Sequence, residues 1–219
     1  QDLKSLEHSV VTLGSMAATA VETAMSALSL RSAALAQSVI DNDDDIDERE
    51  RVIEEHGMLL IATQQPMAGD LRAILAAFAI SQELERIGDY AEGIAKIALA
   101  NLDAPPLPPE APVHETYRMA EIVTSMLRDS LEAFVERDLD AAKRIWNQDD
   151  DVDAMNHDVY ASAQHFMIEH PETIERVTRL LWVAHNLERI ADRVTNICER
   201  VTTMVTGERA RLKASLSTG

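Results

Sequence analysis

The sequence predicts an all-α protein of two tandem, pseudo-symmetric three-helix bundles, and three observations support this fold class. Only 4% of the 219 residues are aromatic and only seven are glycine, whereas Ala, Leu, Glu and Arg, which favour helices, are abundant. Five of the seven prolines lie in residues 101–112, where they exclude a helix and mark a linker. The halves on either side of this linker repeat one pattern.

The repeat is most evident in one helix of each half. ELERIGDYAEGIAK (83–96) and NLERIADRVTNICE (186–199) share L-E-R-I-x-D at an offset of 103 residues. Apolar residues recur through both segments at alternating steps of three and four, which is typical of a helix packed in a bundle. They are Ala77, Ile80, Leu84, Ile87, Ala91, Ile94 and Ala98 in the first half and Leu180, Val183, Leu187, Ile190, Val194, Ile197 and Val201 in the second.

In the first half, residues 1–100, we predict helices over 2–40, 44–64 and 67–100. The first has apolar residues at helical spacing from Leu6 to Leu28. The second begins in the acidic run DNDDDID (41–47), because Asp at a helix start accepts backbone N–H groups and complements the helix dipole. Pro66 separates it from the third helix, since proline favours the first turn of a helix.

In the second half, residues 113–219, the same reasoning predicts helices over 113–137, 141–169 and 171–206. Met119, Val123 and Met126 form part of the apolar stripe of the first helix. The acidic run DDDVD (149–153) belongs to the second, and Pro171 marks the start of the third. With a rise of ~1.5 Å per residue, helices of this length predict an elongated molecule.

The charge of the chain excludes one class of partner. With 38 Asp and Glu against 20 Lys and Arg, the formal net charge is −18, whereas nucleic-acid binding needs Lys and Arg to neutralise phosphates. The single cysteine, Cys198, has no partner for an internal disulfide. No uninterrupted apolar run approaches the ~20 residues that span a bilayer, and no signal-peptide pattern precedes the first helix.

Carboxylates occur in pairs four residues apart, two pairs in each half, and we interpret them as candidate metal ligands. Oxygen ligands at this spacing on adjacent helices can bind hard cations. The alternative is a solvated face balanced by arginine, together with helix capping. The pairs are Asp43 with Asp47, Glu85 with Asp89, Asp149 with Asp153, and Glu188 with Asp192, and Asn196 continues the last row.

Other sites with known spacing are not found in the sequence. A calcium-binding EF-hand loop starting at Asp41 would need Gly and Glu where Ile46 and Val52 stand. A ferritin-like di-iron site needs Glu three residues before His, and none of the seven histidines meets this condition. Phosphate-binding glycine loops and nucleophile elbows are also missing. We therefore expect no enzyme and no catalytic residues.

QQPMAGDLR (64–72), together with the two L-E-R-I-x-D helices, resembles the PhoU family of phosphate-transport regulators. The resemblance implies a cytoplasmic, often homodimeric protein, at the membrane only through its partners. Its members are negative regulators that connect the ATPase subunit (PstB) of the phosphate ABC transporter with the sensor histidine kinase (PhoR). Some members carry multinuclear iron or zinc clusters on Glu/Asp-x-x-x-Asp motifs, and these motifs match the four carboxylate pairs. Asn196 matches the family's Asn, whereas Gly93 replaces it in the first repeat.

The sequence motifs and the resemblance are compatible with three functions. The first is a non-catalytic regulatory binding protein, which the D-L-R and L-E-R-I-x-D motifs favour. The second is the accessory protein of a low-affinity phosphate transporter with a related helical fold. The third is a metalloenzyme that uses the carboxylate clusters.

Overall fold

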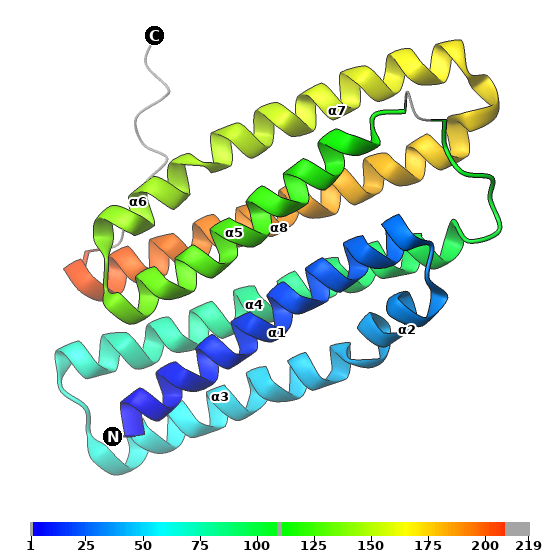
Figure 1. The fold of residues 1–219 in the computed structure, drawn as a ribbon. Coiled ribbons are helices and arrows are strands. Elements are labelled where there is room, and N and C mark those ends of the chain that lie inside the picture. The colour runs from blue at the N-terminus through cyan, green and yellow to red at the C-terminus, as the bar shows by residue number, and fades with distance from the viewer. Residues whose placement is uncertain (1, 109–110, 209–219) are drawn as a thin grey trace, which may run out of the picture.

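The computed structural model describes residues 2–108 and 111–208, and these residues form helices and no strands (Figure 1). The predicted all-α fold is thus confirmed. In chain order the elements are α1 (Asp2–Leu30), α2 (Ala33–Asp41), α3 (Asp43–Gln64), α4 (Ala68–Ala100), α5 (Val113–Glu136), α6 (Leu139–Asn147), α7 (Asp149–Glu169), the 3₁₀ turn η1 (Pro171–Thr173) and α8 (Ile174–Thr206).

Two of the predicted helices are each divided in two, so the continuous helices over 2–40 and 141–169 were wrong. Residues 2–40 break at Arg31, which has a left-handed φ of 50°, and Ser32 then caps α2 by accepting from the Leu35 amide. Residues 139–169 break at Gln148, between α6 and α7. A left-handed residue other than glycine leaves little compositional signal, which explains why the first break was missed.

The same break recurs at the start of α6. Arg137 has a left-handed φ of 57°, and the Asp138 carboxylate accepts from the amides of Asp140 and Ala141 at 2.9 Å. Each repeat is therefore a three-helix bundle in which the middle helix has a short, separately capped first segment.

The two bundles pack against each other through α4 and α8 (Figure 1). Contacts between these helices pair earlier residues of α4 with later residues of α8. Glu83 meets Asn196 near the middle, and Arg72 meets the Met204 carbonyl towards the end of α8. Since the first half of α4 faces the second half of α8, the pair is antiparallel and has pseudo-twofold symmetry.

One hydrophobic core serves both repeats. A single cluster of buried apolar residues extends from Leu6 in α1 to Met204 in α8. At Gly14 a Cβ atom would lie only 2.3 Å from Leu131 Cδ1, so glycine allows α1 to approach α5 closely. The Pro-containing segment therefore connects two halves that also share their interior.

Helix α1 is long and apolar enough to cross a membrane by length and composition alone, with a mean hydropathy of 1.2 over its most apolar window. Half of that window is buried inside the protein. Leu6, Val10 and Leu13 are completely buried and belong to the shared core. The apolar character of α1 is therefore explained by packing within the fold.

Candidate functional site

In the first repeat, the structure brings the predicted carboxylates of α3 and α4 into one cluster. Asp43 and Asp47 lie at the start of α3, and Glu85 and Asp89 lie in the middle of α4. Gly88 permits the close approach, since a Cβ atom there would lie 3.0 Å from Ile46 and 3.4 Å from Asp43. The cluster also includes two carboxylates that were not among the predicted ligands, Glu50 and Glu92.

Several carboxyl groups of this first-repeat cluster have raised pKa values. The pKa of Glu85 rises to about 7, mainly because of burial and then because of Asp89 and Asp47. Burial, followed by the charges of Glu92 and Asp89, raises the pKa of Asp43 to about 6. The pKa of Asp89 is raised for the same two reasons, although the nearby cations Lys96 and Arg86 act in the opposite direction. A proton or a cation would relieve this repulsion.

The equivalent region of the second repeat is less acidic. Asn156 and Thr195 occupy the positions of Glu50 and Glu92. Two of the predicted ligands form ion pairs within α8: Asp192 lies 2.8 Å from Arg189 and Glu188 lies 3.3 Å from His185, whose charge depends on protonation. The two acidic sites are therefore not equivalent, although the sequence pairs match.

Predicted ligands of the second repeat also differ in their surroundings. Asp153 and Glu188 line one hollow of about 450 Å³ between α7 and α8, together with His157 and Tyr160. Asp149 is only 8% exposed. Its charge adds to burial in raising the pKa of the Cys198 thiol to about 12, so this cysteine is neutral at physiological pH.

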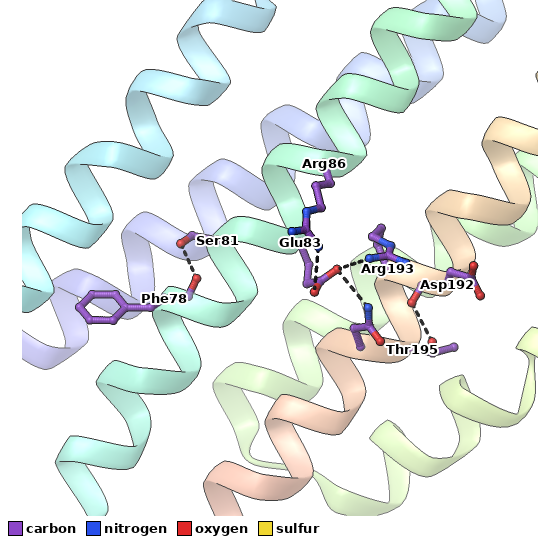
Figure 2. A network of polar contacts seen from close by, with 8 residues as sticks. Phe78, Ser81, Glu83, Arg86, Asp192, Arg193 and Thr195 are labelled. Carbon is purple, nitrogen blue, oxygen red and sulfur yellow. Dashed lines mark hydrogen bonds and ion pairs between the residues drawn. The ribbon is translucent and has the colours of Figure 1, made fainter. Parts of the chain in front are cut away.

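Asn196 contacts Glu83 of the other repeat, and Figure 2 shows Glu83 between Arg86 and Arg193. The side-chain amide of Asn196 donates to Glu83 Oε2 on α4 at 3.2 Å, and Arg193 Nη1 donates to the same oxygen at 3.3 Å. Glu83 is 7% exposed, and Arg86 adds a longer ion pair of 3.9 Å. The structure thus places Asn196 in a polar network between α4 and α8.

The sequence prediction missed Glu83, although a signal was present. Glu83 lies three residues after Ile80 and four before Ile87, and so occupies a position in the apolar stripe. Asn186 interrupts the stripe of α8 at the equivalent place. A Cβ atom on Gly93 would lie 3.2 Å from the Asn186 amide nitrogen. Glycine, in place of the family's Asn, therefore allows α4 and α8 to pack closely at this position.

Comparison with known proteins gives the family. The model of the PhoU domain matches residues 10–98 and 116–201, one match in each repeat. The chain belongs to the PhoU family. A PhoU homologue of the phosphate-specific transport system from Caulobacter vibrioides is 38% identical over 208 residues, covering 95% of this chain and 90% of the relative. The homologue from Clostridium acetobutylicum is also 38% identical, over 96% of this chain and 95% of its own length.

A solved structure supports the PhoU fold directly. The crystal structure of PhoU from Pseudomonas aeruginosa has a TM-score of 0.89 and 31% sequence identity, and the alignment covers 94% of this chain and 98% of that one. The antiparallel packing of two three-helix repeats therefore belongs to a known architecture.

The PhoU resemblance implies metal clusters, and the donor atoms of the candidate site determine which metals fit. The first-repeat cluster offers only carboxylate oxygens, which suit hard cations. Within residues 2–108 and 111–208, however, no three His, Cys, Asp or Glu side chains are grouped closely enough to hold an ion as they stand. The donor chemistry fits a hard cation, and binding would require the partly exposed carboxylates to change rotamer.

Proposed function

We propose that this protein is an accessory protein of a phosphate transport system and a negative regulator of the phosphate response. The similarity over nearly the whole chain to relatives named as phosphate-specific transport system accessory proteins supports this proposal. Its role is to bind other proteins and not to catalyse a reaction. The two L-E-R-I-x-D helices that define the resemblance form the central α4 and α8 pair.

The proposed partners are the ATPase subunit of the transporter (PstB) and the sensor kinase (PhoR), and the protein acts in the cytoplasm as a homodimer. An acidic surface on a chain of charge −18 favours basic patches on its partners and speeds their association at low ionic strength. Tagged protein should therefore retain the ATPase subunit in a pull-down, with retention that decreases as salt increases. Absence of both partners at low salt would contradict this assignment.

A deletion tests the regulatory role. Cells without the gene, and without any paralogue, should express phosphate-starvation genes even when phosphate is plentiful. Reintroducing the wild-type gene should restore repression. Unchanged expression in the multiple deletion would show that the protein does not repress the response.

We further propose that the first-repeat cluster binds iron or zinc. The supporting observation is the crowding of Asp43, Asp47, Glu85 and Asp89, because burial and then their mutual repulsion raise the pKa of three of these carboxyls. A bound metal would neutralise this charge, with the carboxylates of α3 and α4 as its ligands. The second-repeat carboxylates Asp149, Asp153, Glu188 and Asp192, together with Asn196, are the candidate ligands of a weaker site.

Elemental analysis of protein purified without added metal tests the metal proposal. We expect stoichiometric metal that is lost in Asp89→Ala and reduced less in Asp192→Ala. Asp45→Ala is a matched control, because Asp45 is in the same turn of α3 but lines a separate hollow beside α1. Metal-free wild-type protein, or equal loss in the Asp45 variant, would contradict the site.

A further inference from the structure

The segment between the repeats is held by arginines from both of them. Arg31 Nη2, at the break between α1 and α2, donates to the carbonyls of Leu102 and Ala104. Arg176 Nη1, in the first turn of α8, donates to the carbonyls of Pro105 and Pro106 at 2.8 Å. Each contact fixes a guanidinium group in place, although the partner is a neutral oxygen.

Arg31 and Arg176 line one hollow of about 190 Å³ beside this segment. Among the described residues, neither arginine forms an ion pair with a carboxylate. No Asp or Glu of residues 2–108 or 111–208 lines the hollow, whereas four other hollows of the surface each include at least one. In a chain with 38 acidic residues, a described lining with two arginines and no carboxylate favours an anion.

The two arginines that line the hollow have donor groups not used by the linker contacts. A guanidinium group has five N–H donors in a planar fork, and the contacts above use one terminal nitrogen of each arginine. Its Nε and its second terminal nitrogen are therefore left for a further partner. Tyr117, whose hydroxyl pairs with Ser29, and Asn101 also line the wall.

The negative carbonyl end of the neighbouring helix α4 is compensated by an arginine. The carbonyl end of α4 would oppose an anion because of the helix dipole. Arg179 Nη1 donates to the Ala100 carbonyl at 2.7 Å and to Asn101 Oδ1 at 3.1 Å, which offsets this negative end. Acceptance by Oδ1 leaves the amide of Asn101 as a donor.

We infer that this hollow binds a phosphate group, either as the free ion or as a small monoester. Planar guanidinium groups match phosphate oxygens bidentately. Apolar walls from Leu28, Val113 and Leu180 exclude water and strengthen the ionic contacts. Because the linker already orients the two arginines, little side-chain freedom is lost on binding. The inference goes beyond the proposed function, which requires no ligand at this position.

Isothermal titration calorimetry on the full chain, after dialysis against a chelator, tests this inference with inorganic phosphate and with phenyl phosphate as probes. Chelation removes any metal that would bind phosphate elsewhere. We expect saturable binding of at least one probe, and the tighter probe identifies the free ion or the ester as the ligand. Arg31→Gln and Arg176→Gln should each weaken binding by about tenfold or more, the loss of one charged hydrogen-bonded partner.

Two further variants separate ligand binding from the structural role of the arginines. Ser29→Trp leaves both cations in place but fills the hollow, so it should abolish binding while the thermal midpoint changes little. Arg49→Gln removes a charge from the exposed face of α3 and should leave binding unchanged. Absence of saturable binding in the wild-type protein would overturn the inference. So would normal affinity in Ser29→Trp or an equal loss in Arg49→Gln.

Discussion

Replacing Glu83 with alanine should destabilise the protein by about 3 kcal/mol. The substitution leaves Arg193, whose side chain is only 16% exposed, without its carboxylate partner. Arg193 Nε already lacks a hydrogen-bond partner among the described residues. Breaking a buried ion pair costs about 3–5 kcal/mol. The two hydrogen bonds to Glu83, at 3.3 and 3.2 Å, are long, so we expect the lower end of this range.

Urea denaturation followed by far-UV circular dichroism measures the effect as a change in midpoint at constant slope. Glu83→Gln keeps an oxygen acceptor for both donors but removes the negative charge, so it should cost less than Glu83→Ala. Replacing both partners, with Glu83→Leu and Arg193→Met, should cost less than the sum of the single changes, because no buried charge is then left unpaired.

Glu22→Ala is the matched control, since Glu22 pairs with Arg128 at 2.9 Å across the same two repeats but at an exposed position. We expect a loss of about 0.2–1 kcal/mol for this variant. If Glu83→Ala is no more destabilising than Glu22→Ala, or if the double change is additive, burial does not make the Glu83 contact strong.

Three other predictions concern pH, capping and packing. Folding raises the pKa of Asp43 to about 6 and of Glu85 to about 7, so the folded state takes up protons and metal-free protein should melt at a higher temperature at about pH 5 than at about pH 8. Glu85→Gln should reduce this difference, and an unchanged difference would contradict the crowding. Asp138→Ala should cost about 1 kcal/mol in urea denaturation, because it removes the cap of α6; Ser32→Ala should cost less, since its bond is longer at 3.3 Å. Gly57→Ala should destabilise by about 1–3 kcal/mol, because its Cβ would lie 2.2 Å from the Phe78 ring, and a gain in stability would show that the ring moves freely.

Helix periodicity was sufficient to predict most of the fold, because burial follows it closely. Leu84, Ile87 and Ile94 of α4 are completely buried, as their spacing indicated. The break at Arg31 was not predictable from periodicity, since the same apolar spacing fits a continuous helix and a broken one. Its left-handed conformation instead accompanies the Ser32 cap and the contacts of Arg31 with the linker.

The candidate site was predictable in composition more than in geometry. Spacing placed Asp43 and Asp47 near Glu85 and Asp89, because adjacent helices of one bundle bring their rows together. It did not show that Glu50 and Glu92 complete the first cluster, since that depends on which turns of α3 and α4 face each other. Asn196 illustrates the same limit: it follows Asp192 by four residues, but its side chain contacts Glu83 of the other repeat.

The pseudo-twofold relation between α4 and α8 bears on how the molecule evolved. In a symmetric dimer, every contact between two different residues occurs twice, and one mutation changes both copies. Fusion of two such copies into one gene would produce the shared core seen here and would end that constraint. Glu83 with Asn196 and Asn186 with Gly93 are then the two descendants of one ancestral contact, each altered independently. The same freedom would have allowed the two halves to differ in acidity, with Glu50 and Glu92 in the first and Asn156 and Thr195 at the equivalent positions of the second.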